Sequence, residues 1–270
     1  MWFRAVFLSF FLLCAPAWAN SAEEVRALIR AGKYNNAYSI ASELNTAEGF
    51  ALAAESISAQ ILLGELTKLN KHSKRARDFA QRALSLEPEN YNASLQYALA
   101  DGFVTRTSGD ITAWRKKLPT KTLAIIRSFR QNYPEDPRGL ALEGAWHMGV
   151  IRKTGEKNGS KWFGASLDEG LKLYDMARNK NPSDILIETN YAMSLLVLNS
   201  EHYGPYARPV LENISQLKAT TDIDRKVQAR AALVMTHYED QKRVNKLAAD
   251  FLDGEPVSYT HLTLPTIYSV

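Results

Sequence analysis

One stretch of 34 residues, 57–90, constrains the fold of the whole chain, because its small residues and its proline predict two antiparallel helices. Two helices pack closely only where the residues at their crossing are small, and we assign Gly64 and Ala76 to that crossing. Proline has no N–H group and cannot continue a helix. The residues that define the unit are Leu63 and Gly64 on the first helix, Ala76, Ala80 and Ala83 on the second, and Pro88 after it.

This unit resembles the tetratricopeptide repeat family, which implies a stack of helix hairpins with a partner-binding surface and no catalysis. Residues 31–45 resemble the second half of such a repeat, with Lys33 and Tyr34 at the turn and small residues at Ala37 and Ala41. A third resembling half contains Gly170, Tyr174, Ala177 and Pro182.

Apolar residues recur at helical spacing along nearly the whole chain, which predicts an all-α fold. We expect an α-solenoid of about six antiparallel hairpins, similar to tetratricopeptide arrays but with irregular inserted turns. The insertions lie at Thr105–Pro119 and Thr154–Ala165, and they predict a departure from a regular superhelix. The expected hairpins span 22–46, 50–87, 90–133, 138–181, 184–217 and 222–253.

The irregular pattern is also similar to two other all-helical groups. One is the T component of periplasmic TRAP-type uptake transporters, and the other is the regulator of microtubule dynamics family. The first resemblance implies an accessory component of an uptake system, with a pocket for a small organic acid.

The amino-terminal residues 1–19 have the pattern of a secretory signal peptide. Arg4 precedes the apolar run Ala5–Ala15, which is too short to span a bilayer, and a small-x-small cleavage site ends at Ala19. We predict cleavage after Ala19, a periplasmic or secreted location, and no integral membrane segment after cleavage.

Cys14 is the only cysteine and would leave with the signal peptide, so the fold would rest on hydrophobic contacts without disulfides. An export signal without cysteines favours a bacterial periplasm. A lipoprotein signal at Cys14 is an alternative that the bulky Leu13 disfavours, and an uncleaved membrane anchor is another.

At the carboxyl end, residues 257–270 break the pattern of charged helices and resemble a translated sequencing adapter. We therefore predict a non-native tail at 256–270 and a helical array at 20–255 that is truncated at its carboxyl end. A truncated array lacks a polar end cap, so its last hairpin should expose apolar side chains. Those residues are Leu233, Leu247 and Phe251.

The formal net charge of +4 becomes +3 when Arg4 is removed, which favours solubility and gives no argument for a nucleic-acid partner. A basic cluster lies at the turn of the second hairpin, where it forms either a solvated face or a contact for an acidic partner or anionic lipid. Its members are Lys68, Lys71, Lys74, Arg75 and Arg77.

The two inserted turns are the best candidates for a site, because long turns that carry aromatic residues form either a binding lip or a plug packed on the array. The segment at the first insertion, residues 101–114, contains Asp101, Arg106 and Trp114. The second contributes Lys161, Trp162 and Phe163.

Trp146 and His147 are adjacent on a predicted helix, so one should face the groove and the other the core. The alternatives are a core tryptophan beside a hydrogen-bonded histidine, or a polar-aromatic pocket for a carboxylate or a peptide end. In that pocket Arg106 would supply a bidentate fork. The pocket would combine Asp101, Arg106, Trp146, His147 and Trp162.

No metal, cofactor or catalytic group is predicted. The glycine-rich stretch at 155–161 lacks the spacing of a phosphate loop, and no nucleophile motif is present. The histidines have no metal-ligand spacing; the four concerned are His72, His147, His202 and His237.

These features predict an interaction scaffold that binds a protein or peptide through its concave face. The alternative function is an accessory component of a periplasmic uptake transporter that binds a small organic acid. A small-ligand carrier should have an enclosed pocket into which Arg106 or Lys161 points.

Overall fold

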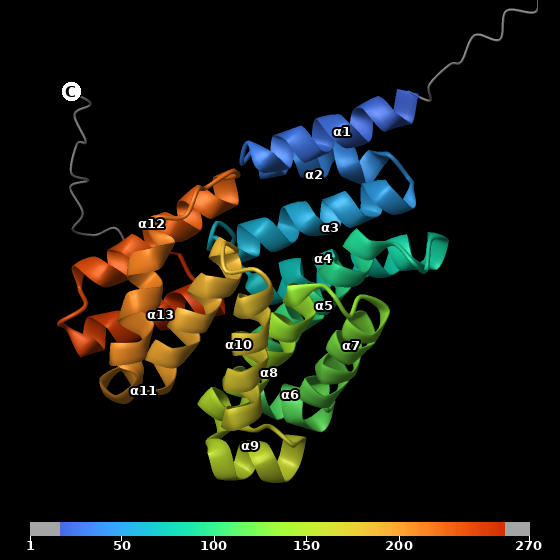
Figure 1. Cartoon of the computed structure of the whole chain (residues 1–270). Helices are drawn as coiled ribbons and strands as arrows, with labels where there is room; N and C mark the ends of the chain where they lie inside the picture. Colours follow the sequence, from blue (N-terminus) through green and yellow to red (C-terminus); the bar gives the residue numbers. More distant parts are fainter. Residues whose placement is uncertain (1–16, 257–270) are drawn as a thin grey trace, which may run out of the picture.

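A computed structural model describes residues 17–256, which form thirteen helices and no strand (Figure 1). The all-α prediction is confirmed, and most helices pack against their neighbours in chain order. The helices are α1 (Ala17–Arg30), α2 (Tyr34–Glu43), α3 (Ala47–Leu62), α4 (Leu69–Leu86), α5 (Tyr91–Thr107), α6 (Asp110–Arg115), α7 (Leu118–Asn132), α8 (Pro137–Thr154), α9 (Glu156–Phe163), α10 (Leu167–Lys180), α11 (Ile185–Ile214), α12 (Asp222–Thr236) and α13 (Gln241–Asp253).

The hairpins lie close to the predicted boundaries. The pairs are α1–α2, α3–α4, α5–α7, α8–α10 and α12–α13, and the two insertions form the short helices α6 and α9. The fifth unit is the long helix α11, which is interrupted at Asn199, where the backbone is extended (φ −165°, ψ 100°). The Asn199 side chain accepts a hydrogen bond from the amide of His202 and caps the second segment.

Small residues allow close approach of the helices within the hairpins. Ala76, Ala80 and Ala83 are fully buried on α4, and Ala177 is fully buried on α10, as predicted. In the fourth hairpin, Gly144 of α8 lies against Gly170 and Tyr174 of α10: a β-carbon at Gly144 would lie 2.9 Å from the Tyr174 ring. Helix ends also follow the prediction, since α4 ends at Leu86 just before Pro88.

The prediction for Leu63 and Gly64 is wrong, because helix α3 ends at Leu62. Leu63 is the buried carboxyl-terminal cap, and Gly64 follows it with φ +68°. Gly64 is therefore a helix stop in the left-handed region, where glycine avoids the clash of a β-carbon. Its second constraint is tertiary: a β-carbon there would lie 2.4 Å from the carbonyl oxygen of Glu255.

The array curves so that its last hairpin contacts its first two (Figure 1). Tyr34 donates a hydrogen bond to Asp222 (3.2 Å), and Lys226 pairs with Glu65 (2.6 Å). Arg230 donates to the carbonyl oxygens of Leu62 and Glu255 at 3.3 and 2.6 Å. These contacts close the array, with α12 beside α1 and α13 beside α3.

The same closure buries the apolar end of the last hairpin. Leu247 and Phe251 are 8% and 3% exposed and belong to one core cluster with Tyr34, Ala59 and Leu63. Leu233 is half-buried against that cluster. The predicted exposure of these side chains is wrong, because the amino-terminal hairpins cover them.

We predict that Gly144→Ala lowers the free energy of unfolding by up to about 2 kcal/mol. Overpacking costs about 1–3 kcal/mol, and alanine recovers about 0.5–1 kcal/mol of helix propensity. The matched control is Gly149→Ala on the same helix, where a β-carbon meets nothing within 4 Å. That variant should gain stability in urea unfolding; equal effects of the two changes would contradict the close contact.

A second pair of variants tests the closure. Gly164→Ala places a β-carbon in open space at φ +71°, so it should cost only the left-handed backbone strain, about 1–2 kcal/mol. Gly64→Ala carries a similar strain and also displaces the Glu255 backbone. It should therefore lower the melting temperature more than Gly164→Ala does, and an equal loss would argue against the docking of residues 253–255 on α3.

Candidate functional site

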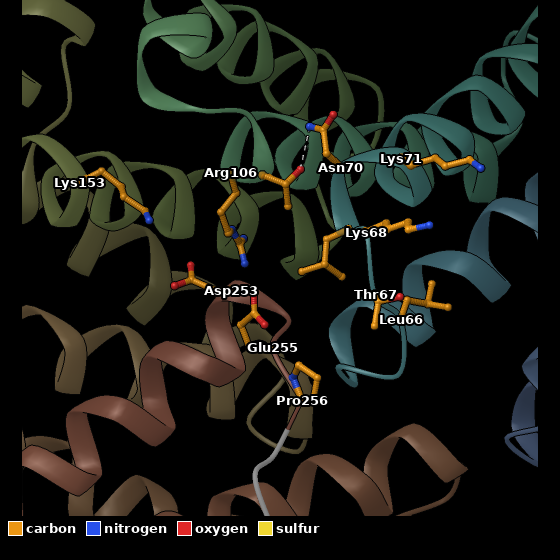
Figure 2. A pocket seen from close by; sticks show the side chains of 12 residues that line it. Leu66, Thr67, Lys68, Asn70, Lys71, Arg106, Lys153, Asp253, Glu255 and Pro256 are labelled. Atoms are coloured by element: carbon orange, nitrogen blue, oxygen red, sulfur yellow. Dashed lines mark hydrogen bonds between the residues drawn. The ribbon is translucent and has the colours of Figure 1, made fainter.

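A cavity of about 790 Å³ opens where the end of the last hairpin meets the second, third and fourth hairpins (Figure 2). Its wall comes from four separate segments: the turn before α4 with the first residues of α4, the carboxyl end of α5, the end of α8, and the end of α13 with the residues that follow it. The lining residues are Leu66, Thr67, Lys68, Leu69, Asn70, Lys71, Arg106, Thr107, Lys153, Asp253, Glu255 and Pro256. The cavity therefore depends on the closure of the array.

Arg106 extends from the last turn of α5 into this cavity, with its guanidinium toward Asp253 and Glu255 (Figure 2). Arg106 is an exposed residue, so water reaches its side chain in the cavity. Nearby protein atoms lower the pKa of the guanidinium, the Asp253 carboxylate opposes that shift, and Arg152 adds to it. Arginine remains charged under these conditions, because its ordinary pKa is above 12.

The Arg106 guanidinium makes no hydrogen bond and no ion pair with any described residue. Its contact is with the ring of Phe103, whose centroid lies 5.5 Å from the guanidinium carbon. Asp253 is already engaged by Arg152, which forms a two-pronged ion pair with it at 2.5 and 3.1 Å. The donors of Arg106 are consequently available to a ligand in the cavity.

The charge around the cavity is predominantly positive. Lys68, Lys71 and Lys153 line it together with Arg106, and none of these three lysines forms an ion pair with a described residue. The acidic lining residues are Asp253, which is neutralised by Arg152, and Glu255. Electrostatically, the cavity favours an anion.

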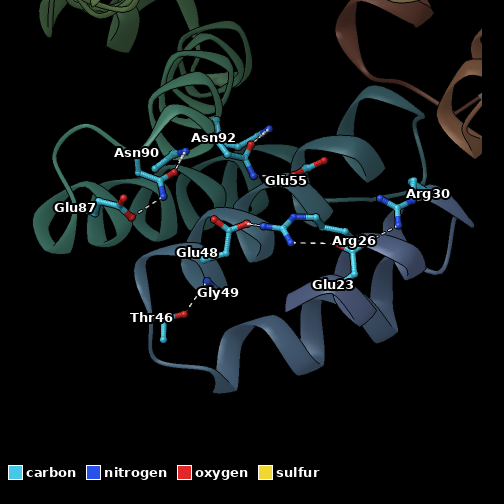
Figure 3. Close-up of polar contacts among 12 residues, drawn as sticks. Glu23, Arg26, Arg30, Thr46, Glu48, Gly49, Glu55, Glu87, Asn90 and Asn92 are labelled. Carbon is cyan, nitrogen blue, oxygen red and sulfur yellow. Dashed lines mark hydrogen bonds and ion pairs between the residues drawn. The ribbon is translucent and has the colours of Figure 1, made fainter. Parts of the chain in front are cut away.

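A second cavity, of about 470 Å³, lies between α1, α3 and α5 and has acidic walls (Figure 3). Its polar groups are largely satisfied: Arg26 pairs with Glu48 at 2.5 Å, and Asn92 donates to Glu55 at 2.8 Å. Burial raises the pKa of Glu55, while the hydrogen bond from Asn92 acts in the opposite direction. Asn90 caps α5 and donates to Glu87. This network joins the first three hairpins, and both arginines of the cavity wall, Arg26 and Arg30, form ion pairs with described residues.

The structure does not bring the five residues of the predicted pocket together. Of these, only Arg106 lines the main cavity. Asp101 is buried between helices, where it accepts a hydrogen bond from Thr122 (2.6 Å) and pairs with Arg77 (3.4 Å). It holds α4, α5 and α7 together.

Trp146 and His147 are both buried, so the expectation that one of them faces a groove is wrong. The Trp146 indole donates to the Pro119 carbonyl oxygen at 2.8 Å and fixes the start of α7 on α8. The His147 Nδ1 accepts a hydrogen bond from the Ser166 amide at 3.1 Å. The two rings meet edge to face at 5.0 Å. This is the core arrangement named above as the alternative to a pocket.

The remaining candidates belong to the inserted helices. Trp114 on α6 and Trp162 on α9 are 62% and 53% exposed, and Lys161 is exposed beside Trp162. Phe163 is half-buried and packs on the cluster that contains Trp146. In the second insertion, Phe163 therefore packs on the core as a plug, whereas Trp162 is exposed on the surface. Lys161 does not line the cavity.

Sequence reasoning missed most of the cavity. Lys68 and Lys71 were visible as part of the basic cluster, but the other members of that cluster have different surroundings: Arg75 lies over the Tyr38 ring and Arg77 pairs with Asp101. No sequence motif marks Lys153 or Asp253 as a site residue, because only the closure of the array brings both of them to the cavity wall.

Within residues 17–256, no group of three or more histidine, cysteine, aspartate or glutamate side chains is arranged to hold a metal ion. None of the helices in this part of the chain is long and apolar enough to cross a membrane. The predicted signal peptide falls mainly on residues 1–16, and the predicted tail mainly on 257–270; both ranges lie outside the described residues.

Comparison with protein-family models finds none that matches this chain, and no curated protein matches its sequence. The likeness to tetratricopeptide repeats therefore stays a prediction from the residues.

His147 gives a pH prediction. Burial lowers the pKa of its imidazole below the ordinary value of 6.5, and protonation at Nδ1 would break the bond from Ser166. The unfolded chain therefore binds this proton more readily, and stability is lost as the pH falls below 6.5. His147→Gln keeps an acceptor but cannot titrate. Its stability deficit in urea should shrink as the pH falls from neutral, whereas a constant deficit would exclude this linkage.

Proposed function

We propose that the chain is an exported helical ligand-binding module whose main cavity holds a carboxylate-bearing ligand. The observation that carries this proposal is the Arg106 guanidinium, which lies in the cavity without a hydrogen-bond or ion-pair partner among the described residues. A guanidinium that no described carboxylate pairs with keeps its N–H donors for a ligand of opposite charge. A ligand carboxylate would supply that charge.

The chemistry of the lining supports a carboxylate in particular. A guanidinium presents parallel N–H donors that match the two oxygens of a carboxylate, and such bidentate pairs are stronger than neutral hydrogen bonds. Lys68, Lys71 and Lys153 line the same cavity and can meet a second acidic group. The volume, about 790 Å³, lies within the range of about 300–1,000 Å³ that is typical of small-molecule sites.

Two sources can supply this carboxylate: a small organic acid, or the carboxyl terminus of a peptide or protein partner. The lining favours the small acid, because it contains no aromatic residue to anchor a peptide side chain. On this proposal the protein acts as the ligand-holding component of an uptake system. The alternative hypothesis, which the same experiment tests, is a scaffold that captures the carboxyl end of a peptide.

The proposal is tested by isothermal titration calorimetry with succinate, acetate, and Ala-Ala-Ala with a free or an amidated carboxyl terminus. We expect succinate to bind most tightly, because it can engage Arg106 and a lysine together. Arg106→Met should weaken binding by about tenfold or more, since a charge-assisted hydrogen bond contributes about 1.5–3 kcal/mol. Added salt should weaken it further.

Lys172→Met is the control, because it removes one positive charge from an exposed site on α10. It should bind as the wild type does. Preference for the free tripeptide over succinate, lost on amidation, would assign the cavity to a peptide end. Equal binding by wild type and Arg106→Met, or no binding of any of these carboxylates, would overturn the proposal.

A further inference from the structure

The two short inserted helices lie at the same end of the array (Figure 1). Helix α6 sits in the turn between α5 and α7, and α9 sits in the turn between α8 and α10. Successive helices alternate in direction, so the turns within neighbouring hairpins fall on the same side. The Trp146 indole on α8 donates a hydrogen bond to the Pro119 carbonyl oxygen and so holds the start of α7 in place.

This end concentrates exposed apolar side chains. Ile111, Trp114 and Trp162 are 76%, 62% and 53% exposed. They are three of the six large hydrophobic side chains that are exposed among the described residues, yet α6 and α9 contain only 6 and 8 residues. The other three, Leu86, Met176 and Tyr206, lie on three different helices.

Helix α9 is packed on the core beneath this surface, whereas α6 has no buried residue. Phe163 lies in the cluster of α7 and α8 side chains, and Gly159 is buried against α8. Trp162, the neighbour of Phe163, remains exposed. The packing holds the helix in place and leaves Trp162 exposed on its outer surface.

Basic side chains surround these apolar groups. Arg115, Lys116, Lys117 and Lys121 follow Trp114, and Lys157 and Lys161 precede Trp162; all six are exposed. None of the six forms an ion pair with a described residue. The two inserted helices contain only two acidic side chains, Asp110 and Glu156. We call Ile111, Trp114 and Trp162, with these six cations, the basic-aromatic end.

We propose that the basic-aromatic end docks on the surface of a bilayer that carries anionic headgroups. Tryptophan places its ring at the level of the headgroups, and long lysine and arginine side chains reach the phosphates around it. Two weak signals, apolar insertion and charge, together give stable peripheral binding. A protein partner fits this composition less well, because lysine is depleted from protein interfaces.

Docking would fix the orientation of the array on the membrane without a spanning helix. The basic-aromatic end consists of residues 111–121 and 157–162, whereas the cavity is lined by residues 66–71, 106, 107, 153, 253, 255 and 256. Membrane docking and ligand binding therefore use different residues, and this inference does not depend on the proposed function.

The test is co-sedimentation of the chain with vesicles of phosphatidylcholine containing phosphatidylglycerol, and with phosphatidylcholine alone. We expect binding to the anionic vesicles only, weakening as salt is added. Trp114→Ala/Trp162→Ala should lower the partition coefficient by about tenfold or more. Lys116→Gln and Lys161→Gln should each lower it about fivefold. All four residues are exposed, so circular dichroism should show unchanged folding.

Tyr206→Ala is the matched control, because Tyr206 is an aromatic residue of similar exposure (65%) on α11, outside the basic-aromatic end. It should bind vesicles as the wild type does. Three results would overturn the proposal: no binding to anionic vesicles at low salt, equal and salt-insensitive binding to both vesicle types, or unchanged binding of the double tryptophan variant. Sedimentation equilibrium provides a further check, since an oligomer that the double variant abolishes would assign the surface to a second copy of the chain.

Discussion

The end of α13 is docked on the end of α3, and the rest of the structure depends on this contact between distant parts of the chain. Arg230 donates to the carbonyl oxygens of Leu62 and Glu255, so it satisfies backbone groups that a helix end leaves unpaired. Glycine at position 64 lets the Glu255 backbone approach closely. The contact buries Phe251 in the main core and brings Asp253 to the Arg152 guanidinium. The joining of these parts of the array forms a cavity that is open to solvent, not the enclosed pocket expected of a small-ligand carrier.

The cavity combines chemistry from segments with different structural roles. Arg106 comes from the end of α5, Lys68 from the turn before α4, and Asp253 from the end of α13. The pairing of Asp253 with Arg152 matters, because it occupies the carboxylate that would otherwise neutralise Arg106. Free positive charge therefore remains in a space of suitable size for a small acid. The basic-aromatic end is chemically different: its apolar side chains are exposed outward, and its cations surround them without forming a cavity.

Much of the fold could be predicted, because the packing of a helix hairpin requires particular residue types at short spacings in the sequence. Alanines at helical spacing, such as Ala76, Ala80 and Ala83, mark a buried face, and prolines such as Pro88 mark where a helix ends. The same reasoning failed at Gly64, since a glycine near a helix end serves equally well as a crossing residue or as a stop. For Trp146 and His147 the core alternative is confirmed and the expectation that one faces a groove is wrong, because two adjacent helical residues can both be buried when helices pack on more than one side. Of the predicted binding residues, Arg106 is the one that lines the main cavity.

The amino-acid sequence by itself determined the helical class, the order of the hairpins and the positions of the two insertions. These features follow from the spacing of apolar residues and from prolines and glycines that end helices, and both signals act between residues close together in the chain. Tertiary structure alone decided that the array closes, which side chains line the cavity, and that Phe163 packs inward while Trp162 remains exposed. The physical reason is the range of the interactions. Helix formation and hairpin packing are local, whereas the curvature of a stack accumulates small rotations over many helices. The contacts of Tyr34 with Asp222 and of Gly64 with Glu255 depend on the summed rotations of all the helices between them. No single segment of the sequence therefore predicts them.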